Sequence, residues 1–173
     1  MAKRAALLEM LKALSGPKSQ LQYAALPYRV TADGLEVLLI TSREQRRWIV
    51  PKGWPMKGKA PFDAAAREAL EEAGVVGKVG QKPLGAYNYE KTLKNGEGIP
   101  CKVEVFPLRV TTQKRTWPER HQRTTQWFPW NEAASAVQEP GLAKLIRRFS
   151  KAAKVSQSLR EAAFMPDVKP AKA

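Results

Sequence analysis

Two kinds of apolar pattern alternate along the chain. Short runs rich in Val, Ile and Leu, bounded by Gly, Pro, Asn or Asp, predict strands, and longer segments rich in Ala and Leu predict helices. The predicted strands lie at 21–30, 35–41, 48–50, 84–93, 101–111 and 125–128. The predicted helices lie at 4–14, 61–73, 131–138 and 140–150. Because strands and helices interleave without regular βαβ spacing, the pattern favours a mixed α+β domain.

The helix at 61–73 has the clearest boundaries. It begins at Pro61, has an alanine-rich interior and stops before Gly74, which is the usual distribution of Pro and Gly at helix ends. The chain as a whole is expected to divide into an N-terminal helical extension at 1–20, one domain at 21–150 and a basic C-terminal tail at 151–173.

Composition narrows the class of protein. The chain has 173 residues, 43% of them apolar, which argues against wholesale disorder. One Cys excludes an internal disulfide and any multi-Cys zinc site, and one His excludes two-histidine metal motifs. No apolar run approaches the roughly 20 residues of a membrane span, and the start of the chain is a poor signal peptide. We therefore expect a cytoplasmic protein without a membrane partner.

The net charge of +14 is unevenly distributed. The ends, 1–20 and 144–173, together supply nine of the fourteen charges. Basic ends are typical of proteins that bind nucleic acid or another anionic partner. They are also explained by solubility alone. A second basic cluster precedes the helix at 61–73 and consists of Arg43, Arg46, Arg47, Lys52, Lys57 and Lys59. This cluster favours a ligand that carries several negative charges.

The helix itself carries three carboxylates on one face. Glu68, Glu71 and Glu72 are related by i, i+3 and i+4 spacing, and like charges so close destabilise a helix unless a cation lies among them. A solvated charged face is the ordinary explanation of such a cluster. Its position between the Gly53 turn and Gly74 favours a functional one.

With these residues the sequence resembles the Nudix hydrolases. Their signature is Gly, five residues, Glu, seven residues, then Arg-Glu-apolar-x-Glu-Glu-x-Gly-apolar, and Lys59 replaces its first Glu here. The positions that match are Gly53, Arg67, Glu68, Ala69, Glu71, Glu72, Gly74 and Val75. The flanking stretches 37–43, 47–53 and 123–128 are most similar to the diphosphoinositol polyphosphate phosphohydrolase branch. The resemblance implies a mixed β-sheet sandwiched between helices over 21–150.

The resemblance also implies a site for Mg²⁺, with Mn²⁺ as an alternative. Glu68, Glu72 and a backbone carbonyl at the Lys52-Gly53 turn would hold the metal ion. Glu71 would take the proton of the attacking water, although relatives divide this role between the residues that match Glu68 and Glu71. Arg67 would pair with a carboxylate of the motif and fix the helix.

Other residues are candidates for contact with metal or substrate. Arg43, Lys52 and Arg123 match basic or substrate-contacting positions of the family. Glu104, on the strand at 101–111, is either a further metal ligand or base, or a surface partner of Lys102. Trp54 could stack on a nucleobase, but the sequence favours a packed tryptophan.

Three functions remain open from the sequence. The first is a Mg²⁺-dependent hydrolase that cleaves phosphoanhydride bonds of dinucleoside polyphosphates or diphosphoinositol polyphosphates by water attack on phosphorus. The second is a catalytically weak Nudix-fold module that binds RNA or a phosphorylated partner. Lys59 and the basic ends favour this hypothesis. The third is an RNA or nucleotide pyrophosphohydrolase. The sequence leaves the oligomeric state open.

Overall fold

The computed structural model describes residues 18–93 and 95–163. The predicted helix at 4–14 and the end of the chain from residue 164 lie outside the described residues. Within the described residues, no helix is both long enough and apolar enough to cross a lipid bilayer.

One mixed β-sheet forms the centre of the molecule. Its strands are β1 (Gln20–Thr31), β2 (Gly34–Thr41), β3 (Trp48–Ile49), β4 (Lys52–Gly53), β5 (Val75–Val79), β6 (Gly85–Thr92), β7 (Gly98–Gln113) and β8 (Thr125–Pro129). The order β3-β2-β1-β7-β5 is extended by β4 on β1, β6 on β7 and β8 on β2. β1 runs parallel to β7, and the other pairs are antiparallel. The predicted mixed sheet is therefore confirmed.

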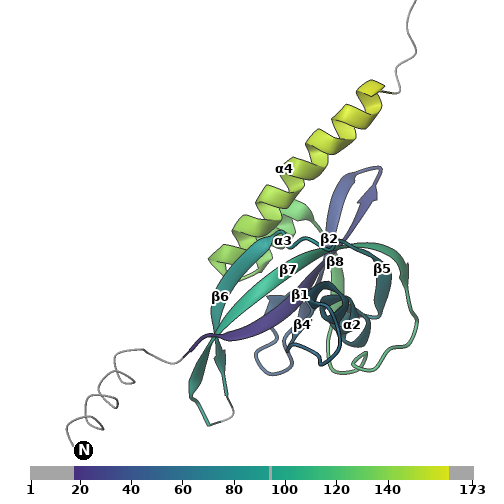
Figure 1. The fold of residues 1–173 in the computed structure, drawn as a ribbon. Coiled ribbons are helices and arrows are strands. Elements are labelled where there is room, and N and C mark those ends of the chain that lie inside the picture. The colour runs from purple at the N-terminus through teal and green to yellow at the C-terminus, as the bar shows by residue number, and fades with distance from the viewer. Residues whose placement is uncertain (1–17, 94, 164–173) are drawn as a thin grey trace, which may run out of the picture.

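Helices cover both faces of this sheet (Figure 1). α2 (Pro61–Ala73) packs on one face, and α3 (Trp130–Ala136) and α4 (Pro140–Ala163) pack on the other. The alternation of side chains along β1 supplies both layers: Ala24 and Leu26 belong to the core beneath α3 and α4, whereas Ala25 belongs to the core beneath α2. This arrangement is the predicted α+β sandwich.

The structure differs from the predicted elements at three places. β5 was not expected, because Gly77 and Lys78 interrupt its apolar pattern; it is an edge strand with a register shift at Gly77, where the strand lies against the backbone of Arg109. The Lys52-Gly53 segment is a two-residue strand paired with β1 rather than a turn. The helix predicted at 140–150 continues to Ala163, since no Gly or Pro follows Gly141 within it.

α2 is held close to the sheet by small side chains. Ala64, Ala65, Ala69 and Ala73 are fully buried, and alanines at these positions let the helix backbone approach the strands. The helix ends at Gly74, whose left-handed backbone (φ +69°) lets its N–H bond to the carbonyl of Leu70 at 3.1 Å. The carboxylates of α2 consequently lie at the edge of the buried alanine face, next to β4.

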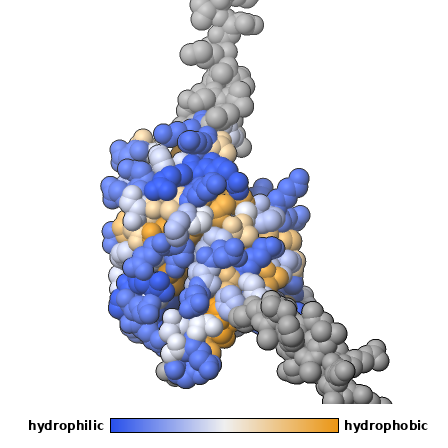
Figure 2. Space-filling view, turned by 90° about the vertical axis from the view of Figure 1, so that its left-hand side faces the viewer, coloured by the Kyte–Doolittle hydropathy of each residue, from blue (hydrophilic) through white to orange (hydrophobic). Residues whose placement is uncertain are grey.

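Polar residues cover most of one face of the molecule (Figure 2). The face of the molecule in Figure 2 carries mostly hydrophilic residues, with hydrophobic residues in small groups between them. α4 adds exposed cations to this polar surface without any acidic residue before Glu161; they are Lys144, Arg147, Arg148, Lys151 and Lys154.

Candidate functional site

A pocket of about 420 Å³ opens beside α2. Its walls come from β1, the 42–47 loop, β4, α2, β6 and the 117–123 segment. Charged side chains of both signs line it. The basic ones are Arg43, Arg47, Lys52, Lys91 and Arg123, and the acidic ones are Glu44, Glu68, Glu71, Glu72 and Glu119. Because these residues come from distant parts of the chain, the sheet and α2 together create the pocket.

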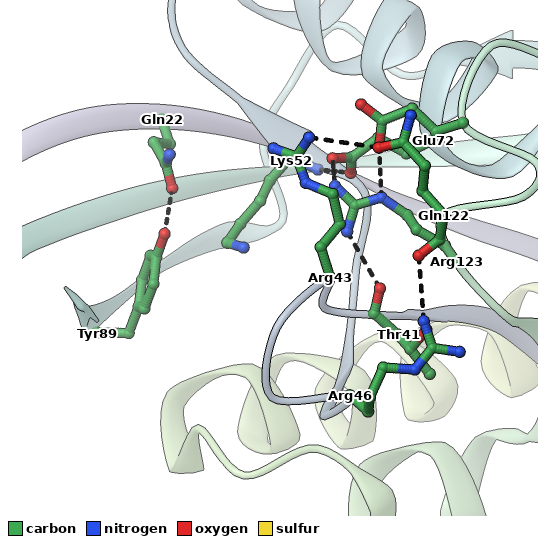
Figure 3. Close-up of polar contacts among 10 residues, drawn as sticks. Gln22, Thr41, Arg43, Arg46, Lys52, Glu72, Tyr89, Gln122 and Arg123 are labelled. Atoms are coloured by element: carbon green, nitrogen blue, oxygen red, sulfur yellow. Dashed lines mark hydrogen bonds and ion pairs between the residues drawn. The ribbon is translucent and has the colours of Figure 1, made fainter. Parts of the chain in front are cut away.

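Glu72 is the most buried of the pocket carboxylates. Its side chain is 8% exposed, its Oε2 accepts a hydrogen bond from the backbone N–H of Lys52 at 3.0 Å, and its Oε1 pairs with Arg123 (Figure 3). Burial raises the pKa of Glu72 to about 7, although the Arg123 charge and the Lys52 N–H both act to lower it. Glu72 therefore sits where extra positive charge would stabilise its ionised form.

Arg123 connects three separate segments around Glu72. Besides Glu72, its guanidinium contacts Glu119 Oε2 at 2.6 Å and the backbone carbonyl of Thr41 at 3.1 Å. Its side chain is only 6% exposed. The guanidinium of Arg123, predicted to bind substrate, is thus hydrogen-bonded to protein groups in this structure, and it fixes Glu72 in place.

Glu68 lies directly against Gly53. A Cβ atom on Gly53 would overlap the Glu68 carboxylate, so the glycine leaves the room that this side chain occupies. β4 holds Gly53 there by pairing it with Tyr23 of β1. Burial, followed by the charges of Glu71 and Glu119, raises the pKa of Glu68. Contact between the first glycine of the motif and its first helical glutamate is therefore a close steric fit.

Glu71 and Arg67 form a pair along α2. The Arg67 Nε lies 2.5 Å from Glu71 Oε1, and both side chains are partly exposed. The Glu71 backbone carbonyl also accepts a hydrogen bond from the N–H of Glu119 at 3.0 Å. The pair keeps Glu71 at the pocket wall and the backbone bond ties the 117–123 segment to the helix.

The remaining predicted residues lie at different distances from this centre. Arg43 lines the pocket, with its Nη1 3.4 Å from Gln122 Oε1. The Lys52 ammonium lies 4.9 Å from the centre of the Tyr89 ring, and burial lowers the pKa of Lys52. Glu104 is half-buried on β7, beside Tyr23 of β1 and Ala86 of β6, and does not belong to the described residues that line the pocket. Its predicted metal or base role stays a prediction.

Comparison with known proteins identifies the family of this chain. A family model described as the NUDIX domain matches residues 21–149. The chain belongs to the Nudix family. Nudix hydrolase 12, mitochondrial, of Arabidopsis thaliana is 31% identical over 129 residues, covering 73% of this chain and 64% of that protein. Thus the chain spans less than two thirds of that relative's length.

Two further similarities bear on the Nudix assignment. The diphosphoinositol polyphosphate phosphohydrolase 3-alpha of Mus musculus is 33% identical over 117 residues, covering 66% of this chain and 67% of that protein. The crystal structure of the C. elegans Ap4A hydrolase superposes with a TM-score of 0.57 at 21% identity, covering 77% of this chain and 97% of that chain. The predicted resemblance to the family, including this branch, is confirmed, and the structural match supports the fold.

The departure from the Nudix signature lies outside the pocket. Lys59 is exposed and lines a second, shallow hollow together with Asp63 and Arg67. The loss of the first signature glutamate therefore removes no carboxylate from the wall formed by α2. Lys59 instead adds a cation to the wall of that second hollow.

The donors of the pocket fit a hard divalent cation. Glu68 and Glu72 are carboxylates one turn apart, and burial raises the pKa of both, so a cation between them would compensate their charge. A carboxylate oxygen has two lone pairs, so Glu72 can accept more than its present partners. Within the described residues, no group of three or more His, Cys, Asp or Glu forms a preassembled metal site. Mg²⁺ commonly takes one or two carboxylates and completes its shell with phosphate and water.

Several pocket residues were not found from the sequence. Glu119 lies in the 114–124 connection, whose sequence has no strand or helix periodicity, so nothing marks it before folding. Tyr89 and Lys91 are separated by one residue on β6, and this spacing predicts that both side chains lie on the same side of the strand. The expectation that Trp54 is packed was wrong: its side chain is 41% exposed, because it follows β4 at the pocket wall rather than facing the core.

Proposed function

We propose that this chain is a Nudix pyrophosphohydrolase that cleaves a phosphoanhydride bond of a polyphosphorylated small molecule with the help of Mg²⁺. The observation that carries this proposal is the meeting of Glu68, Glu71 and Glu72 with five basic residues in one pocket. Carboxylates alone would repel a polyphosphate, and cations alone would only bind it. The family match and the relatives that are named as hydrolases support the enzyme class.

The residues divide the work of phosphoanhydride hydrolysis between them. Glu68 and Glu72 would hold the metal ion. That ion would neutralise negative charge on the phosphate oxygens and lower the pKa of bound water. Arg43 and Lys52 face the pocket and bind phosphate oxygens. Glu71 accepts the proton of the attacking water at its Oε2, since Arg67 engages Oε1 and orients the carboxylate. Arg123 is a positioning residue that holds Glu72.

A substrate panel tests the proposed function. Purified full-length protein with Mg²⁺ or Mn²⁺ is incubated with diadenosine tetraphosphate, a diphosphoinositol polyphosphate and 5′-triphosphorylated RNA. We expect release of phosphate or mononucleotide from at least one of them. In ¹⁸O-labelled water the label is expected on a phosphate product, because water attacks phosphorus. If neither metal supports release from any of the three substrates, the proposal is wrong.

A binding module remains the second candidate because of α4. Lys144, Arg147, Arg148, Lys151 and Lys154 are all exposed on this helix, and clustered cations attract the phosphate backbone of RNA. Salt-dependent RNA binding that persists in a protein with no turnover of any panel substrate would favour this second function over the first.

Replacing Gly53 with Ala tests the close fit at Glu68. The new Cβ would displace the Glu68 carboxylate, which can move because it is the end of a flexible side chain. We expect turnover to fall by roughly 10²-fold, since displacement of a reactive group by about 1 Å can cost that much, while the melting temperature changes little. Steady-state kinetics and thermal melting measure the two effects.

Gly98→Ala is the matched control. Its Cβ would also meet a flexible carboxylate, that of Glu90, and neither residue lines the pocket. We expect wild-type turnover from this variant. Equal turnover in Gly53→Ala and Gly98→Ala would show that the position of Glu68 does not matter for the reaction.

A further inference from the structure

Arg47 is a cation of the pocket to which the proposed reaction assigns no role. It lines the pocket, and its side chain is 31% exposed. Its Nη1 donates to Gln138 Oε1 at 3.2 Å and lies 3.7 Å from Glu139 Oε1. Within the part of the chain that the structure describes, its Nη2 makes no hydrogen bond to protein. A guanidinium with a free nitrogen at a pocket wall can bind a phosphate oxygen there.

The ion-pair partner of Arg47 is a buried carboxylate. The Glu139 side chain is 10% exposed and is not among the described residues that line the pocket. Among the described residues, its Oε2 is buried without a hydrogen-bond partner, as is Arg47 Nε. A buried carboxylate destabilises a protein unless an opposite charge compensates it, and Arg47 is the one cation of the described chain that forms an ion pair with Glu139. The two side chains therefore depend on each other.

Glu139 lies at a closely packed point of the fold, the junction of α3 and α4. Val137 before it and Leu142 after it belong to the core, at 7% and 0% exposure. Its backbone carbonyl accepts a hydrogen bond from the Ala143 N–H at 3.1 Å. Because the core fixes the backbone on both sides of this carboxylate, Glu139 can serve as an anchor for the side chain of Arg47.

Arg47 ends a short loop that begins at Ser42. The Ser42 N–H donates to the Arg47 carbonyl at 2.8 Å, and the Arg47 N–H donates to Ser42 Oγ at 3.0 Å. These bonds fix the Arg47 backbone but not its long side chain. An arginine side chain loses conformational freedom when it binds a ligand, and contacts that already orient it reduce this cost. The contacts with Gln138 and Glu139 orient it before a ligand arrives.

We propose that Arg47 binds a phosphate group of the ligand and that Glu139 is the positioning residue that holds Arg47 for this contact. The inference rests on the proposed function, to which it adds one phosphate contact and its buried support. Glu139 acts on the ligand through Arg47. A carboxylate that acted on a phosphate directly would repel it, so the two roles predict opposite effects of removing Glu139 on the affinity.

Calorimetry with an uncleavable ligand tests the inference independently of turnover. Bis(methylene)triphosphonate, a tripolyphosphate analogue that water does not cleave, is titrated with Mg²⁺ into the full chain and its variants. Arg47→Ala is expected to bind it about tenfold more weakly, and Glu139→Ala about fivefold more weakly. The double variant is expected to stay within about twofold of Arg47→Ala, because Glu139 has no effect once Arg47 is absent. Glu132→Ala removes an exposed carboxylate of α3 and is expected to bind as the wild type does.

Two further measurements separate positioning from stability. With the best substrate of the panel, Glu139→Ala is expected to raise KM while kcat stays within about twofold of the wild type. Glu139→Gln keeps an acceptor oxygen and the side-chain volume, and its affinity for the analogue is expected to fall only about threefold. If Glu139→Ala does not fold, Glu139→Gln decides the question, and an affinity equal to or above that of the wild type would then overturn the inference.

The other outcomes also overturn the inference. Tighter binding by Glu139→Ala would mean direct repulsion, and unchanged binding with a lower melting temperature would mean a purely structural role. Additive losses in the double variant would mean that Glu139 acts independently of Arg47. Unchanged binding by Arg47→Ala, or a wild type that does not bind the analogue, would exclude the phosphate contact. Arg47-dependent binding without turnover of any panel substrate would refute only the proposed function, and turnover with Arg47-independent binding would refute only the inference.

Discussion

Glu72→Gln is expected to lower the turnover number by roughly 10³-fold with the fold intact. The amide oxygen of Gln can still accept the Lys52 N–H, which lies 3.0 Å from Glu72 Oε2, and the side-chain volume is nearly unchanged. The negative charge that would hold a divalent cation is lost. Steady-state kinetics with the best substrate of the panel, at saturating Mg²⁺, measures this effect.

The same variant has a second readout that does not depend on activity. The pKa of Glu72 is raised to about 7 in the folded protein from an ordinary value of 4.5. A raised carboxyl pKa contributes stability that is fully present below pH 4.5 and is lost as the pH rises through about 7. The metal-free wild type should therefore lose stability across this window because of Glu72. Glu72→Gln should not show this pH-dependent loss of stability. Thermal melting from pH 4 to 8 compares the variant with the wild type.

Glu36→Gln provides the control for both measurements. Glu36 pairs with Arg29 at 2.6 Å on the surface of β2, away from the pocket. We expect this variant to keep the turnover and the pH profile of the wild type. Near-wild-type turnover in Glu72→Gln would refute the assignment of Glu72 as a metal ligand.

Arg123→Ala is expected to destabilise the protein by about 3–5 kcal/mol. The side chains of Arg123 and Glu72 are 6% and 8% exposed, so removal of the guanidinium leaves Glu72 buried without its charged partner. Glu119 and the Thr41 carbonyl lose a donor at the same time. For a chain of this size the melting temperature should fall by roughly 10 °C, and denaturant unfolding at pH 8 should show the same loss.

Two further variants separate burial from charge. Arg29→Ala removes an exposed guanidinium that pairs with Glu36, and it should cost only about 1 kcal/mol. Arg123→Lys keeps the charge but cannot bridge Glu72, Glu119 and Thr41 together, so we expect an intermediate loss. A melting temperature of Arg123→Ala equal to that of Arg29→Ala would contradict the role of Arg123 as the support of Glu72.

Most of the fold was accessible from local patterns. The helix predicted at 61–73 coincides with α2, because Pro61 and Gly74 mark its ends in the sequence itself. The alternating strands at 21–30 and 35–41 were found as β1 and β2. β5 and the length of α4 were not, since a short edge strand containing Gly77 has little pattern and no residue marks an end at 150.

The sequence by itself determined that three carboxylates share a helix face, because helix periodicity is a local property of the chain. Only the tertiary structure decided that Arg123 is bound to Glu72, 51 residues away, and that Glu119 joins them. It also decided that Trp54 is open to the pocket beside Lys91 rather than packed in the core. These contacts form because β4, β6 and the 117–123 segment lie together around α2. The residue spacing within any one of these segments does not predict contacts between them.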